Sequence, residues 1–175
     1  MFRKTFLSLA IVLLAKLIYS QTPNWQKFDI VHYQINLNLT DLTTNNLTAK
    51  TEVTFTVNTN NIDTLFLQLA ALNVDSIICK NQNLGFTHSG NILKIPLNDT
   101  VNIGDTATVA VFYGGTPIKD GSGFGGFYFS AAYAYNLGVA INGNPPSFGR
   151  SWFPCIDSFT DKATYDLKVL TTLPK

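Results

Sequence analysis

The residue types that most often perform catalysis or bind metal are scarce in this chain. It has two histidines, His32 and His88, and one glutamate, Glu52. A helical zinc site needs two histidines one turn apart with a glutamate between them, and these two stand far apart in the sequence. Glu52 falls on the polar face of an expected strand and has no second carboxylate at a suitable spacing. No serine stands in a Gly-x-Ser-x-Gly motif. We therefore expect His32, just before the first strand, and His88, in a turn, to be structural or solvated, and the chain alone to catalyse nothing.

A segment near the carboxyl end is more distinctive in its residue types. Trp152 and Phe153 would bring large apolar surface to the core or to a domain interface. Pro154 fixes one backbone angle and ends strand pairing. Arg150 and Asp157 can tie the turn together by a charge-assisted hydrogen bond. Taken by itself, this segment predicts a structural corner.

The same segment resembles the signature that closes the amino-terminal domain of M1 zinc aminopeptidases (aminopeptidase N-like), usually Ala-Arg-x-x-Phe-Pro-Cys-x-Asp-Glu-Pro followed by Lys-Ala-x-Phe. The residues that match this signature are Arg150, Phe153, Pro154, Cys155, Asp157, Lys162 and Ala163. We expect them, and Trp152 of the same stretch, to have a structural role. Residues 32–37 look like the opening strand of that domain. Tyr113-Gly114-Gly115 and Gly125-Gly126-Phe127-Tyr128 look like two of its landmarks. The resemblance spans residues 28–173.

The resemblance implies a role as scaffold and as one wall of a substrate cleft, in a parent enzyme that removes residues from the amino terminus of peptides. The zinc helix and the catalytic domain, which would be its partner, would lie beyond Lys175, so neither a catalytic nor a metal residue is carried over. In aminopeptidases a residue of the loop before the arginine helps to hold the free amino group of the substrate. Here a Glu-Pro pair is replaced by Pro145 and Pro146. We expect Asn144, Pro145 and Pro146 to line the cleft.

The elements that position these residues are predicted to be strands. Tyr33, Ile35 and Leu37 alternate with polar residues, and residues 47–57 resume the pattern after a turn, which is typical of a hairpin. Further strands are expected at 64–69, 74–80, 84–87, 92–97, 107–113, 127–130 and 163–171. Short strands separated by polar turns, with no convincing amphipathic helix, predict an all-β fold, an antiparallel β-sandwich of the saddle-like amino-terminal aminopeptidase type.

The first twenty residues have the pattern of a secretory signal. Arg3 and Lys4 precede an apolar run over residues 6–15, which is too short for a membrane span and is followed by Lys16. Residues 1–20 would be removed, and residues 21–175 would form one domain, secreted or periplasmic, with no membrane span after signal removal. That part carries a net charge of about −2, which gives no basic patch for nucleic acid.

Two alternatives stay open in the sequence. Cys79 and Cys155 could form a disulfide in an oxidising compartment, but their apolar neighbours favour two buried thiols. The rival to the scaffold role is an exported stand-alone β-sandwich that acts as a binding or adhesion module.

Overall fold

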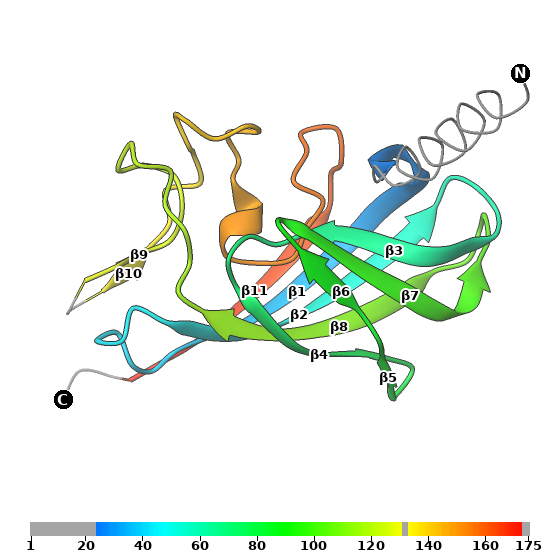
Figure 1. Cartoon of the computed structure of the whole chain (residues 1–175), viewed down its shortest axis with the longest axis horizontal. Coiled ribbons are helices and arrows are strands. Elements are labelled where there is room, and N and C mark those ends of the chain that lie inside the picture. Colours follow the sequence, from blue (N-terminus) through cyan, green and yellow to red (C-terminus); the bar gives the residue numbers. More distant parts are fainter. Residues whose placement is uncertain (1–23, 131–132, 173–175) are drawn as a thin grey trace, which may run out of the picture.

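The computed structural model describes residues 24–130 and 133–172, and strands account for about half of them (Figure 1). The predicted signal at residues 1–20 lies outside these residues. Two short 3₁₀ helices are present, η1 (Trp25–Lys27) and η2 (Gly149–Ser151). The strands are β1 (Phe28–Leu39), β2 (Leu47–Val57), β3 (Ile62–Gln68), β4 (Asn73–Cys79), β5 (Gln82–Leu84), β6 (Thr87–Ser89), β7 (Ile92–Val101), β8 (Ala107–Gly115), β9 (Tyr128–Phe129), β10 (Ala134–Tyr135) and β11 (Thr164–Thr171). Within the described ranges, no helix is long and apolar enough to cross a bilayer.

Two sheets form the layers of a sandwich. The larger has the strand order β11-β1-β2-β8-β4-β5, and the smaller has the order β3-β7-β6. Figure 1 shows the smaller sheet crossing one end of the larger one, while the segment that contains η2 covers the middle of the same face. A separate hairpin is formed by β9 and β10. The predicted all-β sandwich is confirmed.

One pair departs from the antiparallel pattern: β11 runs parallel to β1. A parallel neighbour needs a long crossover connection, and here the chain passes through the whole rest of the domain between the two strands. Local alternation of residues predicted the strand at 163–171 but not its direction.

The alternation of buried residues explains why β1 and β2 form. Burial changes parity within β1, from Phe28 and Ile30 to Tyr33 and the odd-numbered residues after it. The shift coincides with an irregularity in the β1–β2 register between Ile30 and His32, as expected for a bulge, which adds one residue to one strand. The first strand therefore begins at Phe28, and His32 lies inside it rather than before it.

Two smaller expectations were wrong. The predicted strand at 84–87 is divided between β5 and β6, which belong to different sheets. Gly85 and Phe86 connect them, and a glycine without a side chain to pack weakens a strand at that point. His88 consequently lies in β6 and not in a turn, and its Nε2 is 2.8 Å from the carbonyl oxygen of Leu69.

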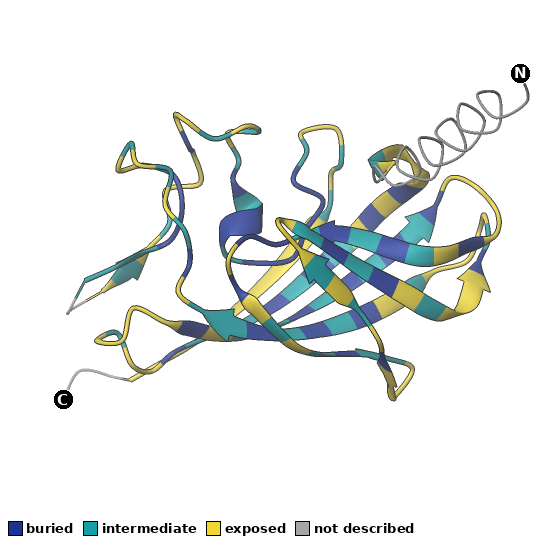
Figure 2. Ribbon diagram, viewed as in Figure 1, coloured by how far each residue is buried: buried dark blue, intermediate teal, exposed yellow. Residues whose placement is uncertain are grey.

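The core lies between the two layers (Figure 2). It is built from fully buried aliphatic and aromatic side chains of β1, β2, β3, β7 and β8, among them Ile30, Phe55, Leu67, Leu93 and Val111. Tyr33 and Tyr113 bring hydroxyl groups into this core. Tyr113 pairs its hydroxyl with Thr51 at 3.0 Å, so the two buried polar atoms satisfy one another.

Candidate functional site

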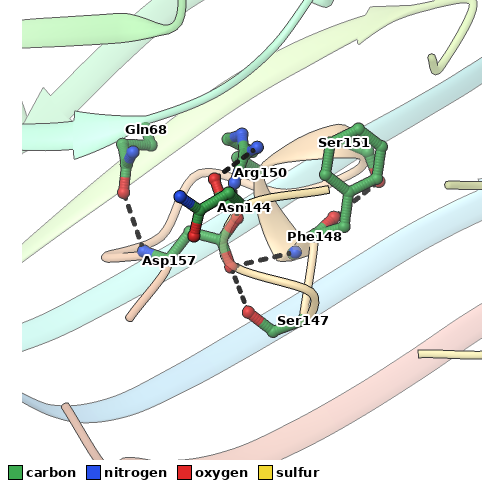
Figure 3. A network of polar contacts seen from close by, with 8 residues as sticks. Gln68, Asn144, Ser147, Phe148, Arg150, Ser151 and Asp157 are labelled. Atoms are coloured by element: carbon green, nitrogen blue, oxygen red, sulfur yellow. Dashed lines mark hydrogen bonds and ion pairs between the residues drawn. The ribbon is translucent and has the colours of Figure 1, made fainter. Parts of the chain in front are cut away.

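A buried carboxylate organises the turn that carries the distinctive segment. Asp157 Oδ1 accepts hydrogen bonds from Ser147 Oγ at 2.6 Å and from the Gly149 N–H at 3.2 Å, and Oδ2 accepts one from Arg150 Nη1 (Figure 3). Arg150 Nη2 also donates to the carbonyl oxygen of Asn144 at 3.1 Å. We call these five residues the Asp157 clamp. The ion pair expected between Arg150 and Asp157 is present, with both side chains almost wholly buried.

The backbone next to the clamp is closely packed at Phe148 and Gly149. Phe148 has a left-handed conformation (φ 51°) and directly precedes η2. The N–H and the hydroxyl of Ser151 both donate to the Phe148 carbonyl. A Cβ at Gly149 would stand 3.0 Å from the ring of Phe153 and 3.2 Å from Cys155 Sγ. A side chain at this position would force Phe153 or Cys155 to shift by a few tenths of an ångström, because the turn passes directly against the core.

The clamp is fixed to the sandwich through β3 and β1. Gln68, at the end of β3, exchanges both backbone hydrogen bonds with Cys155, at 2.7 and 3.0 Å, and its side-chain oxygen accepts from the Asp157 N–H at 3.0 Å. The Tyr33 hydroxyl accepts from the Ile156 N–H at 3.0 Å. The ring of Tyr33 meets that of Phe153 edge to face, with the centroids 5.4 Å apart. The turn is thus held by the two layers of the sandwich at once.

The other residues of the distinctive segment divide into packed and exposed ones. Phe153, Pro154 and Cys155 are buried. Trp152 is half-buried, with its ring centroid 4.6 Å from that of Phe153 and 6.0 Å from that of Phe127. Lys162 is exposed.

Asn144, Pro145 and Pro146 form a surface loop beside the clamp. Asn144 and Pro146 are exposed and Pro145 is half-buried. The backbone of the loop is held from two sides, because Arg150 binds the Asn144 carbonyl and the Ala140 N–H donates to the Pro146 carbonyl at 2.7 Å. The predicted cleft-lining residues are therefore brought together on the surface, in a fixed backbone conformation.

A second carboxylate stabilises the neighbouring glycine-rich loop. Asp120 accepts hydrogen bonds from the Ser122 hydroxyl, at 2.6 Å, and from the N–H groups of Ser122, Gly125 and Asn142. The hydrogen bond from the Ser122 side chain is the main cause that lowers the pKa of Asp120 to about 2. The bond from Asn142 connects this loop to the segment that leads to Asn144.

A pocket of about 270 Å³ lies against the clamp. Its lining includes Ser147, Trp152, Asp157, Asp161 and Tyr165, and it does not include Asn144, Pro145 or Pro146. Burial raises the pKa of Asp161, whose carboxylate accepts from the Ile30 N–H at 3.1 Å. The pocket combines aromatic walls with carboxylates.

None of the described groups near the clamp is poised as a nucleophile or a metal ligand. Burial raises the pKa of the Cys155 thiol, which therefore stays protonated and unreactive. Cys155 and Cys79 are both free thiols. Among residues 24–130 and 133–172, no three His, Cys, Asp or Glu side chains gather in a way that could hold a metal ion. His32 contacts Thr164 and Asp166 in the larger sheet, His88 belongs to the smaller one, and Glu52 pairs with Lys50 at 2.6 Å. The residues that the structure describes therefore do not fit a zinc site.

Sequence reasoning missed three members of the site. Gln68, Ser147 and Tyr33 all form hydrogen bonds with Ile156 or Asp157 of the recognised motif, and all three lie outside that motif in the sequence. Tyr33 was expected only as one apolar residue of an alternating strand. The sequence contained no signal for the roles of Gln68 and Ser147, because their partners are decided by how the layers pack.

Comparison with known proteins gives one family and a set of similar folds. The family model described as the peptidase M1 N-terminal domain matches residues 30–175. A search of curated proteins finds no match. Among solved structures, the M1 zinc metallopeptidase from Deinococcus radiodurans is similar with a TM-score of 0.70 and 21% identity over 83% of this chain and 32% of that one. A mutant of it bound to a Tyr-Ser-Ala substrate has a TM-score of 0.71 and 20% identity over 83% and 33%. Yeast LTA4 hydrolase with bestatin has a TM-score of 0.64 and 18% identity over 91% and 27%. This chain spans about a third or less of the length of these structures.

Proposed function

Because the chain belongs to the peptidase M1 N-terminal domain family, we propose that it is the non-catalytic amino-terminal scaffold of a secreted M1-like zinc metallopeptidase, where it forms one wall of the substrate cleft. Zinc and the general base would be supplied by a catalytic domain that follows in the same polypeptide. That enzyme would remove residues from the amino terminus of peptides, in the periplasm or outside the cell.

The observation that carries this proposal is the Asp157 clamp. A buried ion pair with satisfied hydrogen bonds is a costly way to shape a turn, because each charge must be taken out of water. Here the Arg150 guanidinium that binds Asp157 also donates to the carbonyl of Asn144, so the buried ion pair holds a surface loop in place. Rigid positioning of loop residues is what a substrate-binding wall needs.

The chemistry of the loop also limits how it could hold a substrate. Pro145 and Pro146 carry no charge, and the carbonyl oxygens of Asn144 and Pro146 are already hydrogen-bonded within the chain. A free amino group would find no carboxylate at these positions. We therefore propose that Asn144, Pro145 and Pro146 contact the peptide through side-chain packing and the exposed amide of Asn144.

The first experiment reads the gene beyond codon 175. An open reading frame that encodes a helix with two histidines one turn apart and a glutamate between them is expected. A stop codon directly after codon 175, together with a soluble folded product, would overturn the scaffold proposal and favour the exported stand-alone binding or adhesion module.

The second experiment measures kinetics of the full-length enzyme with Asn144→Ala. We expect a higher KM for peptide substrates with little change in kcat, because the loop binds but does not react. Asn83→Ala is the matched control, since Asn83 is an exposed asparagine on β5, at one edge of the larger sheet. Equal kinetics for both variants would contradict the cleft-wall role.

The third experiment uses the 175-residue chain alone, with zinc and an aminoacyl reporter peptide. Neither turnover nor stoichiometric zinc binding is expected, because the chain lacks the ligand pattern of a zinc site. Either result would refute the non-catalytic assignment.

A further inference from the structure

The pocket that lies against the Asp157 clamp is formed by several segments of the chain. The turn at residues 147–158 supplies most of its lining, and Asn136, Gly138, Asp161 and Tyr165 supply the rest. Its volume is about 270 Å³, slightly below the roughly 300–1,000 Å³ that is usual for pockets that hold drug-sized ligands. The pocket is therefore of a size for a small molecule or a single side chain.

Three aromatic rings line this pocket, and neighbouring rings hold them in place. Tyr165 stacks on Tyr33 with the centroids 5.2 Å apart, and it meets Phe153 edge to face at 6.3 Å. The ring centroid of Trp152 lies 4.6 Å from that of Phe153. The walls are thus positioned by contacts within the domain. Faces of aromatic rings attract cations, because the ring quadrupole is negative there.

The two carboxylates that line the pocket differ in how their charges are balanced. Asp157 is paired with Arg150. Asp161 accepts a hydrogen bond from the Ile30 N–H at 3.1 Å, and it belongs to none of the ion pairs formed among the residues that the structure describes. One negative charge at the wall of the pocket is therefore left without a cation from the described part of the chain.

Burial makes this charge unfavourable for the folded chain. Asp161 is half-buried, and burial is the main cause that raises the pKa of its carboxyl group. The hydrogen bond from Ile30 opposes this shift of the pKa, and the charge of Asp29 adds to it. A cation in the pocket would offset the unfavourable burial of the carboxylate, and carboxylates in such environments are common at functional sites.

We propose that this pocket binds an organic cation, a primary ammonium or a guanidinium group, with its charge at the Asp161 carboxylate and its carbon chain against Trp152 and Tyr165. Basic groups of this kind combine an apolar stem with a charged tip, which matches the aromatic walls and the carboxylate. An anion would be repelled by Asp161, and a large ligand would exceed the volume of the pocket. The pocket consists of residues of this chain, so the proposal does not depend on the proposed function.

The test is an NMR titration of the 175-residue chain with n-butylammonium chloride at pH 7. We expect saturable shifts of the Gly138 and Ser158 amide signals and of the Trp152 indole N–H. The matched ligand is 1-butanol, which has the same carbon chain without the charge. It is expected to bind roughly tenfold more weakly or worse, because it forms no charge pair with Asp161. Equal affinities for the two ligands would contradict the role of charge.

Variants assign the binding to individual side chains. Asp161→Asn keeps an oxygen that accepts from the Ile30 N–H but removes the charge, and it should raise the dissociation constant of n-butylammonium by roughly tenfold or more. Asp63→Asn is the control, because Asp63 is exposed on β3 and its loss changes the net charge equally. Tyr165→Leu removes one aromatic wall and should weaken binding by about two- to fivefold.

Thermal unfolding at pH 7 separates loss of the ligand from loss of the fold. Because folding raises the pKa of Asp161, the protonated carboxyl group is favoured in the folded state and the ionised one opposes folding. Asp161→Asn is therefore expected to keep or raise the melting temperature while it weakens binding. A lower melting temperature together with unchanged affinity would assign Asp161 a structural role and overturn the proposal.

A second titration identifies the source of the cation, and this arm rests on the proposed function. If the cation comes from solution, n-butylammonium also binds a longer protein that contains the catalytic domain. If a basic side chain of that domain occupies the pocket, the longer protein does not bind n-butylammonium although the 175-residue chain does. Both results agree with a pocket for an organic cation. The proposal is wrong if the 175-residue chain binds no n-butylammonium, or if wild type and Asp161→Asn bind it equally.

Discussion

The Asp157 clamp and β11 lie close together in the sequence, yet they differ in which kinds of side chain the sandwich buries. In the clamp, polar and charged side chains are buried, and their hydrogen bonds are made inside the domain. In β11, apolar side chains at alternate positions are exposed, although their neighbours on β1 belong to the core. Residue type would have suggested the reverse.

The difference shows that coverage by a second layer decides burial. The turn lies between β3 and β1, so its polar groups meet fixed partners from both layers. The edge strand β11 is exposed along its whole length (Figure 2), although Tyr165 at its start contacts Phe153 edge to face. Polar groups inside are stabilising only when all are paired, and apolar groups outside are available for a partner.

The largest effect on the free energy of unfolding is expected from a variant that breaks the clamp. Asp157→Ala leaves the Arg150 guanidinium buried without its carboxylate, which should lower the free energy of unfolding by about 3–5 kcal/mol. The matched control is Asp99→Ala, which removes the exposed Lys80–Asp99 pair and should cost about 0–1 kcal/mol. Urea unfolding measures both. Equal losses would mean that burial does not distinguish the two ion pairs.

A second pair of variants compares the two strands directly. Ile35 and Leu167 are register partners on the same face. Ile35→Ala should cost about 2–5 kcal/mol because it opens a cavity in the core. Leu167→Ala should change the free energy of unfolding by no more than about 0.5 kcal/mol, because this side chain is largely exposed. A large loss for Leu167→Ala would show that β11 is covered in solution.

A smaller effect is expected where the clamp joins β1. Tyr33→Phe keeps the ring but removes the acceptor for the Ile156 N–H, and leaving this buried donor unsatisfied should cost about 1–3 kcal/mol. Tyr165→Phe, on β11, is the control and should remain within about 0.5 kcal/mol. The difference in urea midpoint between the two variants reports the value of this hydrogen bond. Equal urea midpoints for the two variants would mean that water replaces the Tyr33 hydroxyl at the Ile156 N–H.

The smallest effect concerns acid stability of the loop next to the clamp. The pKa of Asp120 is lowered to about 2 from an ordinary 3.8, so the folded state favours the ionised carboxyl group. This contribution is fully present above about pH 4 and is lost as the pH falls towards 2. Asp120→Asn removes it, and the melting temperature of the variant should therefore fall less between pH 5 and pH 2 than that of the wild type.

A graded variant sharpens this measurement. Ser122→Ala removes the largest cause of the lowered pKa but keeps the carboxylate. Its melting temperature should show an intermediate dependence on pH. If all three proteins had parallel profiles, Asp120 would make no contribution to acid stability.

Much of the fold could be predicted from local patterns. Alternation located β2 to the residue and most of β1, and turn residues separated the strands that followed. The bulge near His32 hid the first residues of β1, because the apolar positions change parity there. The division of 84–87 between two sheets was missed, since a short run with one glycine gives no alternation to follow.

The candidate site was predictable only in part. The residue types of Arg150 and Asp157 indicated their ion pair, and the resemblance indicated the loop at Asn144. The partnership of Asp157 with Ser147 and of its backbone with Gln68 had no sequence signal. Gln68 is 89 residues away along the chain, and such a contact exists only after two layers have packed.

The sequence by itself determined the β class, the positions of most strands, the family and the lack of a zinc-ligand pattern, because each of these depends on residue type and local spacing. The tertiary structure decided the parallel pairing of β11, the burial of the clamp and the exposure of the apolar side chains on β11. These depend on which surfaces meet, and the free energy of a buried charge or an exposed leucine is set by its neighbours in space rather than in sequence.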